Sequence, residues 1–262
     1  MSYRFKYLTC KLEDRIMLIT VNRPEVHNAL NSEVFKEIGA VFQQMEDDPE
    51  VKVVVITGAG EKAFIAGSDV AEMSQCTLLE AKDFTKVVYR SQQSIANFPK
   101  PTIAAINGFA FGGGLEVAMC CDIRMASERA KLGQLEVNVG IIPGGGGTQR
   151  LARLIGAGRA KEMIYTAVPI DGQRAFEIGL VNHVVPHDKL MEETMMLAKK
   201  ISEKSAVLVS LAKAAIDTGA DMDLDNALRT EAEIFAECFG TLDGKEGLVA
   251  FVEKRKANIL DK

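Results

Sequence analysis

The sequence of 262 residues is poor in the residues that build disulfide frameworks and metal sites. Its three histidines show no metal-binding spacing such as HExxH, so no metal site is expected. Its five cysteines are irregularly spaced and include no CxxC pair, which argues against disulfide pairing and zinc binding. Reduced thiols fit a cytosol-like compartment, and we expect a cytoplasmic protein.

A basic surface and a long lipid-compatible segment are also missing. The formal net charge is −5 with mixed signs, which argues against nucleic-acid binding. The N-terminal residues 1–15 contain no uninterrupted apolar segment typical of a signal peptide. The longest apolar region, 103–121, contains Asn107, three glycines and Glu116, so no membrane span is expected.

What the sequence does contain is a pattern of alternating strands and helices. Residues 15–21, 51–57 and 102–106 are short β-branched apolar runs that predict buried strands. Between the first two, helical spacing of apolar residues predicts a helix over 32–46, with Ser32 as its N-cap. This alternation indicates an α/β core over residues 1–190.

The character of the chain changes after residue 190. Residues 191–262 are mostly helical in pattern and are interrupted by glycines. No linker rich in proline, serine or charge precedes them. We therefore expect a helical C-terminal region that packs on the core or on a neighbouring subunit. Its expected helices cover 188–202, 205–217, 222–238 and 244–256.

The first stretch that indicates chemistry is Gly112–Gly114, between a predicted strand and a helix from about residue 114. A helix start carries unpaired backbone N–H groups and partial positive charge. Glycine lets another molecule approach that backbone closely, because it has no Cβ. Such a place suits a phosphate or an oxygen that becomes negative during a reaction. An alternative of equal weight is that these glycines only allow the helix to pack tightly on a strand.

A second stretch, "KAFIAGSDVAEM" (62–73), also runs through a small-residue turn into a helix. Ser68 or Asp69 is the expected N-cap, and Glu72 stands in the position of a capping box. The N–H groups near Ala66 and Gly67 are candidates for a second donor. Two donors on separate loops that converge would form an oxyanion hole for a thioester.

Two glutamates lie in apolar surroundings of the sequence. Glu116 follows the glycine run, where the helix dipole alone would explain an acid. Glu136 lies between Leu135 and Val137, where an exposed strand would explain it equally well. Near an oxyanion hole, the two would form an acid/base pair. A third glycine run, 144–147, lacks the lysine of a P-loop and predicts a loop framing a pocket or an interface.

Taken in order, these motifs resemble the enoyl-CoA hydratase/isomerase (crotonase) superfamily, and most closely its short-chain enoyl-CoA hydratases. The resemblance runs nearly end to end and implies a spiral of repeated ββα turns. It also implies a helical C-terminal trimerisation region and a homo-oligomer, as a trimer or a hexamer built as a dimer of trimers. The matching segments are "NRPEVHNALN" (22–31), 62–73, "KPTIAAINGFAFGGGLEVAMCCDI" (100–123), "LGQLEVNVGIIPGGGGTQRL" (132–151), "GLVNHVVP" (179–186) and "FVEKRKAN" (251–258).

The resemblance also implies roles for individual residues. The N–H groups of Ala66 and Gly113 would form the oxyanion hole. Glu116 would activate water and Glu136 would handle the Cα proton. No cofactor or metal is implied, since CoA is part of the substrate. Residues bordering the CoA moiety would be Pro24, Glu25, Val26, His27, Ala66, Gly67, Ser68, Asp69 and Gly113.

The implied activity is the reversible addition of water to a short- or medium-chain 2-enoyl-CoA. Both acids are present, whereas isomerases, hydrolases and dehalogenases of the superfamily typically alter one of them. Leu115 and Leu135 depart from the family pattern beside the acids, and Glu25 replaces a common lysine, so a branched or cyclic enoyl-CoA is the alternative substrate. A non-catalytic CoA- or RNA-binding homologue is a further alternative, which the acidic net charge disfavours for RNA.

Overall fold

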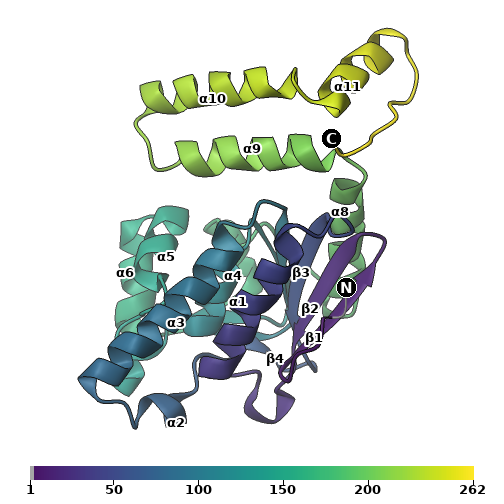
Figure 1. Cartoon of the computed structure of the whole chain (residues 1–262). Coiled ribbons are helices and arrows are strands. Elements are labelled where there is room, and N and C mark those ends of the chain that lie inside the picture. Colours follow the sequence, from purple (N-terminus) through teal and green to yellow (C-terminus); the bar gives the residue numbers. More distant parts are fainter. Residues whose placement is uncertain (1–2) are drawn as a thin grey trace.

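The computed structural model describes residues 3–262, and its larger sheet contains six strands in the order β1-β2-β3-β5-β7-β10 (Figure 1). β1 pairs antiparallel with β2, and every later neighbour is parallel. The three predicted strands are confirmed as β2, β3 and β5. The bounds are β1 (Leu8–Glu13), β2 (Ile16–Val21), β3 (Val53–Gly58), β5 (Thr102–Ile106), β7 (Ile123–Ser127) and β10 (His183–Val185).

The second sheet has four short strands in the order β4-β6-β8-β9. The chain passes from the larger sheet to the smaller one and then enters a helix, in the successions β3-β4-α3, β5-β6-α4 and β7-β8-α5. Short 3-10 or α-helical turns interrupt some of these connections. This is the repeated ββα unit that the family resemblance implies. The bounds are β4 (Ala63–Ile65), β6 (Phe109–Phe111), β8 (Lys131–Gly133), β9 (Ile170–Asp171), α3 (Leu78–Ala96), α4 (Gly113–Cys120) and α5 (Gly147–Ile155).

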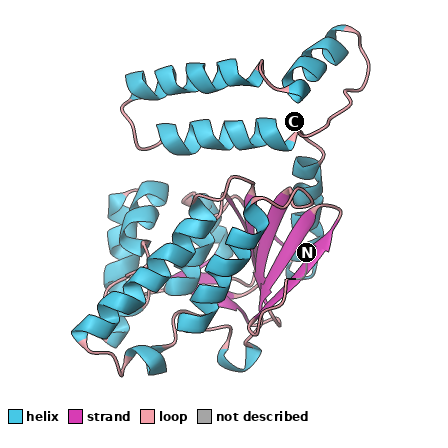
Figure 2. Cartoon of the chain, viewed as in Figure 1, coloured by secondary structure: helices cyan, strands magenta, loops and turns pink. Residues whose placement is uncertain are grey.

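Helices cover the larger sheet, as Figure 2 shows by secondary structure. α1 (Ser32–Glu46) presents its apolar face to the main core and packs on α3, with Phe35 edge-on to Phe84 at 5.9 Å. Its N-cap is Asn31 rather than Ser32, because the Asn31 side chain accepts from the Val34 N–H. The shorter elements are η1 (Pro24–Val26), α2 (Val70–Met73), η2 (Glu136–Val139), α6 (Ala157–Thr166), α7 (Gly172–Glu177) and η3 (His187–Lys189).

The other face of the sheet is covered by α8 (Leu190–Ser202). Strand side chains alternate between faces, so Val54 and Ile56 enter the main core while Val53 and Val55 meet α8. α8 therefore packs on the sheet as part of the body. Residue 190, where α8 begins, is where we expected the separate C-terminal helical region to start. The helices that stand away from the body are α9 (Ala206–Gly219), α10 (Leu224–Cys238) and α11 (Leu242–Val252), here called the helical arm (Figure 1).

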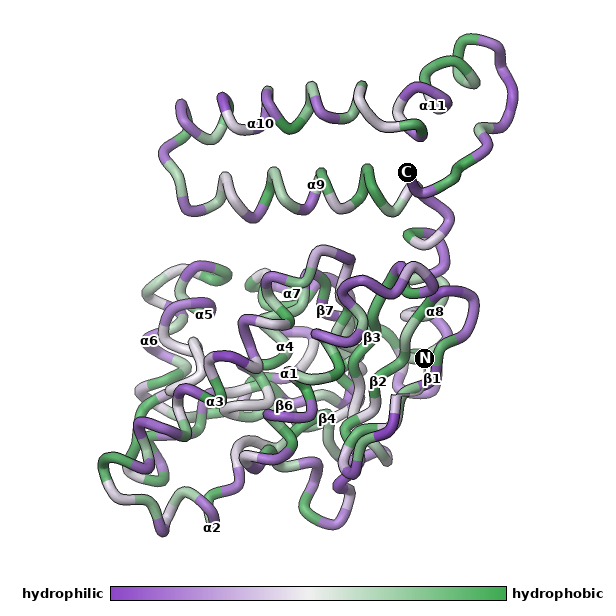
Figure 3. Tube along the Cα trace, viewed as in Figure 1, coloured by the Kyte–Doolittle hydropathy of each residue, from purple (hydrophilic) through white to green (hydrophobic). Residues whose placement is uncertain are grey.

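The helical arm exposes many large apolar side chains. Apolar and polar residues alternate along its helices in Figure 3, and Phe251 is 84% exposed. No helix within residues 3–262 is long and apolar enough to cross a membrane. The exposed apolar residues of the arm are Ile216, Met222, Leu224, Leu228, Phe235, Phe239, Leu242, Leu248, Val249, Phe251 and Val252.

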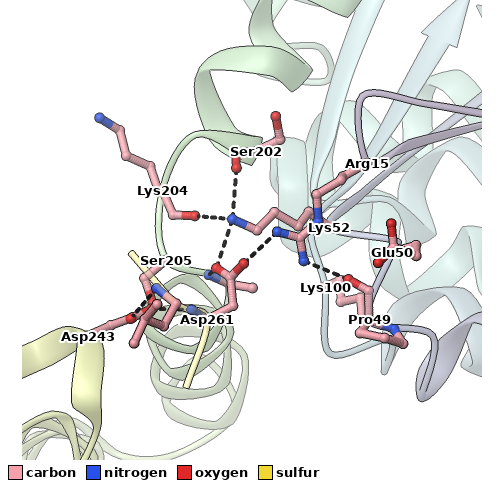
Figure 4. A network of polar contacts seen from close by, with 12 residues as sticks. Arg15, Pro49, Glu50, Lys52, Lys100, Ser202, Lys204, Ser205, Asp243 and Asp261 are labelled. Carbon is pink, nitrogen blue, oxygen red and sulfur yellow. Dashed lines mark hydrogen bonds and ion pairs between the residues drawn. The ribbon is translucent and has the colours of Figure 1, made fainter. Parts of the chain in front are cut away.

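A polar network joins the arm to the body where α8 ends (Figure 4). The Asp261 carboxylate pairs with Lys52 Nζ at 2.8 Å and with Arg15 at 2.6 Å, and accepts from the Ala206 N–H. Lys52 is only 7% exposed and also donates to the Ser202 and Lys204 carbonyls. The C-terminal segment thus lies against both the sheet and the start of α9.

Candidate active site

A cavity of about 800 Å³ opens where the β4–α2 loop, α3, the start of α4 and residues 135–145 meet. Its wall contains both predicted acids, Glu116 and Glu136, and the backbone of two glycine-rich turns. The remainder of the wall is mainly apolar, which suits an aliphatic chain. The large apolar lining residues are Val70, Met73, Phe84, Val88, Phe111, Leu135, Val139, Ile141 and Ile142.

Glu116 lies in the first turn of α4 and is 3% exposed. Gly112 precedes that helix at φ 48° and ψ −121°, a backbone conformation that glycine adopts without a steric penalty. The Glu116 Oε1 atom accepts two hydrogen bonds of 2.8 Å, from the N–H groups of Gly145 and Gly147. The third glycine run therefore frames the cavity, as predicted, and also holds the carboxylate of Glu116.

Opposing influences act on the pKa of Glu116. Burial raises it above the ordinary value, while the Gly147 and Gly145 N–H groups, the Arg150 charge and the Gln92 side chain oppose that rise. A side chain at Gly145 would displace Glu116, since a methyl group there would lie 2.4 Å from Glu116 Oε2. Glu116 is therefore desolvated, yet four groups around it favour its carboxylate form.

Glu136 begins η2 rather than lying on an exposed strand, and it is half-buried. In the amide orientation that satisfies both groups, Gln134 donates to its two oxygens at 2.8 and 3.1 Å. Burial, helped by the charge of Glu116, raises the pKa of Glu136 to about 7. A methyl group on Gly112 would lie 3.0 Å from Glu136 Oε1, so this acid lies against the turn that starts α4.

The backbone donors differ from the predicted pair in one member. Gly113 is the first residue of α4, whose N–H has no partner inside the helix, and it lines the cavity. The prediction for Ala66 is wrong, because its N–H donates to the His27 carbonyl at 3.1 Å. The N–H of Ser68 meets no acceptor within residues 3–262, and a methyl group on Gly113 would lie 3.4 Å from Ser68 N.

The pairing of two loops explains why Ser68, and not Ala66, has the free donor. The Leu30 N–H donates to the Gly67 carbonyl and the Asp69 N–H donates to the Leu30 carbonyl, which forms a parallel bridge between Leu30 and Ser68. In such a bridge the peptide groups flanking Ser68 point at the partner chain, and its own N–H points away. Gly113 lies close to this nitrogen, since a methyl group on it would be 3.4 Å away.

The structure brings together only part of the predicted CoA border. Ala66, Gly67, Ser68 and Gly113 line the cavity. Pro24, Glu25 and Val26 form η1, and His27 follows in a left-handed conformation. Within the described residues 3–262, these four residues and Asp69 do not line the cavity. The loop contacts described above nevertheless hold them beside the cavity.

Asp69 and Glu72 have other partners than expected. Asp69 precedes α2 without a capping hydrogen bond and pairs with Arg23 at 3.3 Å. Glu72 accepts from the N–H and hydroxyl of Ser32, so it joins α2 to the start of α1 rather than closing a capping box. Both contacts fix the cavity edge to the N-terminal part of the chain.

Sequence reasoning missed Gln92, Gln134 and the donor role of Gly145 and Gly147. The signal available for Gln92 was an amide in line with Val88 and Ile95 on the apolar face of α3. For the glycines no local signal exists, because their acceptor is 29 or 31 residues away in the sequence.

Comparisons with known proteins show the family to which the chain belongs. The model of the family Enoyl-CoA hydratase/isomerase matches residues 11–262. The chain is 45% identical to crotonyl-CoA hydratase of Syntrophomonas wolfei, covering 98% of this chain and 99% of that protein. It is 48% identical to short-chain-enoyl-CoA hydratase of Clostridium acetobutylicum, covering 93% and 94%. The solved enoyl-CoA hydratase of Bacillus anthracis is 39% identical, with a TM-score of 0.94 and coverage of 98% and 100%.

Proposed function

Because the chain belongs to the enoyl-CoA hydratase/isomerase family, we propose that it is a short-chain enoyl-CoA hydratase. It adds water reversibly across the 2,3 double bond of a 2-enoyl-CoA to give the 3-hydroxyacyl-CoA. The observation that carries the proposal is the placement of Glu116 and Glu136 in one cavity beside two free backbone donors. The names of the two relatives above support the same activity.

The backbone donors of Gly113 and Ser68 bind the thioester carbonyl oxygen. Two hydrogen bonds to this oxygen polarise the conjugated double bond and make Cβ electrophilic. They also stabilise the negative charge that the enolate places on the oxygen after water attacks. The donors are fixed by α4 and the loop pairing, so they need no reorganisation during the reaction.

The two acids have different protonation preferences, which suits opposite proton transfers. Glu116, held by the two N–H groups and beside Arg150, serves as the carboxylate that takes a proton from water. The hydroxide equivalent bonds to Cβ while electrons move toward the carbonyl. Glu136, with a pKa of about 7, supplies a proton to Cα. The overall change is the addition of one water molecule, and the substrate is neither oxidised nor reduced.

The reaction therefore calls for no redox cofactor, and CoA enters only as part of the substrate. The apolar wall receives the acyl chain, while the loop 24–28 and residues 66–69 border the CoA moiety. Leu135 lines the cavity beside Glu136, whereas Leu115 is buried in the core and does not reach the wall. Of the two departures, Leu135 is thus the one that shapes the acyl pocket.

An assay with a panel of enoyl-CoA thioesters tests the proposal. Purified protein is mixed with crotonyl-CoA and with longer, branched and cyclic 2-enoyl-CoAs, and loss of the conjugated thioester absorbance is followed. We expect the highest kcat/KM with a short straight chain. A preference for a branched or cyclic chain would replace the substrate assignment, and turnover of none, with CoA esters still bound, would favour a non-catalytic homologue.

We further propose a cytoplasmic homo-oligomer, a trimer or a dimer of trimers, in which the helical arm contacts neighbouring copies. The exposed apolar side chains of the arm support this, because a second copy of the chain would remove them from water. The five cysteines are free, which fits a reducing compartment. Light scattering during gel filtration should give three or six times the chain mass. A Phe251→Asp variant should lower that mass, and a monomeric wild-type protein would contradict the proposal.

A further inference from the structure

Gln92 is a buried amide whose position is unusual for its polarity. It lies on the apolar face of α3 and is 1% exposed. Its Nε2 atom makes no hydrogen bond of ordinary geometry within residues 3–262, although the contact of this side chain with Glu116 favours the carboxylate form of that acid. A buried donor without a partner is unfavourable, so a folded protein retains one where something else requires it.

The amide of Gln92 faces the catalytic carboxylate across Gly145. A methyl group on Gly145 would lie 2.4 Å from Gln92 Nε2 and 2.4 Å from Glu116 Oε2, so both atoms flank the same point. Oε1 of Glu116 already accepts from two backbone N–H groups. Oε2 is thus the oxygen left for chemistry, and it is the one beside the unpartnered amide.

We propose that Gln92 is a positioning residue for the hydration reaction, donating its amide N–H to Glu116 Oε2 in the substrate complex. This inference rests on the proposed function. The hydrogen bond aims the second carboxylate oxygen and favours the ionised form that water activation requires. Gln92 does this without adding charge to the cavity, where a cation would attract the carboxylate away from the reacting water.

Other groups near Glu116 set its electrostatic background. Arg150 of α5 favours the carboxylate, and the charge of Glu116 in turn raises the pKa of Glu136 on η2. The Cys120 thiol lies one helical turn further along α4 and donates to the Glu116 carbonyl. None of these groups is altered when Gln92 is replaced by a neutral residue, so a changed pH dependence reports on the amide itself.

A Gln92→Met variant removes both polar atoms and keeps an unbranched chain of similar length. We expect kcat to fall about 10- to 100-fold, the range for losing a hydrogen bond to a charged group, with a smaller change in KM. The acid limb of the kcat profile, which reports on the substrate complex, should move to higher pH, because losing a donor raises the pKa of the carboxylate. Stability should stay equal or rise, since an unpartnered buried donor has been removed.

Ser91→Ala is the matched control. Ser91 neighbours Gln92 on α3, is equally buried, and has a hydroxyl without a partner, but it faces Gly39 of α1. We expect this control to retain the wild-type kcat and pH profile. Unchanged kcat and pH profile in Gln92→Met, or a loss of kcat that matches a loss of stability with an unshifted profile, would overturn the inference.

A second readout separates this inference from the proposed function. In protein with carbon-13-labelled glutamate, the carboxyl resonance of Glu116, assigned from its absence in Glu116→Gln, is titrated with a bound, unreactive saturated acyl-CoA. The pKa of Glu116 should be higher in Gln92→Met than in the wild type, whether or not any enoyl-CoA is hydrated. Equal values would overturn the role of Gln92 and leave the hydratase assignment standing.

Discussion

The carboxylate of Glu116 accepts a 2.8 Å hydrogen bond from the N–H of Gly147, a residue 31 positions further along the chain. Gly147 begins α5, and Glu116 lies in the first turn of α4, so the bond joins two helix starts. Together with the bond from Gly145, it fixes one oxygen of the acid, while the other oxygen accepts no backbone hydrogen bond within residues 3–262. The geometry of the acid therefore depends on a loop that contributes no reacting side chain.

Replacing Gly145 by alanine should displace Glu116. The added methyl group would lie 2.4 Å from both Glu116 Oε2 and Gln92 Nε2, which is far closer than van der Waals contact allows. We expect kcat to fall by about 100-fold, because small displacements of a catalytic group are costly. Gly144→Ala is the control, since a methyl group there meets nothing within 4 Å, and it should lose far less. Similar kcat values for the two variants would contradict this account.

Replacing Gly113 by alanine tests the two backbone donors. The methyl group would lie 3.4 Å from Ser68 N and 2.7 Å from Ser68 Oγ, inside the gap that we propose receives the thioester oxygen. We expect the red shift of a conjugated acyl-CoA on binding to shrink, because its carbonyl is polarised less. The double variant Gly113→Ala with Ser68→Ala removes the clash with Oγ and should still show the reduced shift. A full red shift in the double variant would refute the assignment of these donors.

The raised pKa of Glu136 predicts a pH limit on hydration. In the proposed mechanism its protonated form supplies the Cα proton, and burial raises its pKa to about 7. The rate of hydration should therefore fall as pH rises through about 7, since the proton is then lost from free enzyme. Stopped-flow measurement of kcat/KM for crotonyl-CoA between pH 5 and 9 checks this, with each value read as belonging to the coupled acid pair. A rate that is constant across that range would contradict the role of Glu136.

The junction of body and arm should weaken when Asp261 is replaced by asparagine. Burial opposes ionisation of Asp261, but the Ala206 N–H, Lys52 and Arg15 outweigh it and hold its pKa below the ordinary value. Losing this acceptor should lower the free energy of unfolding by about 1–3 kcal/mol at pH 7. Since the folded-state pKa is lowered, the contribution is present above the unfolded pKa of about 4 and is lost as pH falls through the folded value.

Urea denaturation at pH 7 and at acid pH measures this contribution. The control is Asp225→Asn, whose partner Arg229 and own side chain are both largely exposed on α10, so little change is expected. If Asp261→Asn and Asp225→Asn destabilise the protein equally, the junction is no more than a surface ion pair.

Local sequence pattern was sufficient for three of the strands, for α1 and for the C-terminal helices. The β-branched runs became β2, β3 and β5, and each predicted C-terminal helix is present with boundaries shifted by a few residues. The N-cap of α1 was misplaced by one residue, because serine and asparagine adjoin and only geometry decides which accepts the hydrogen bond. The placement of α8 on the sheet is decided by tertiary packing and not by sequence pattern, since its helical pattern resembles that of the arm.

The site was predicted where side-chain chemistry identified it and missed where the backbone supplied it. Glu116 and Glu136 were found because a carboxyl in apolar surroundings stands out in a sequence. The direction of the Ala66 and Ser68 N–H groups follows from pairing with residues 27–30, which sequence does not reveal. The contact between Glu116 and the third glycine run is likewise a product of the ββα winding.

The most direct measurement is the rate of crotonyl-CoA hydration by the wild-type protein and by Glu116→Gln and Glu136→Gln. Each variant keeps the size of the side chain and removes its acid chemistry. The account predicts that kcat falls by orders of magnitude in both, while binding of a CoA ester, measured by calorimetry, stays nearly unchanged. Near-normal hydration by either variant would contradict the two-acid mechanism.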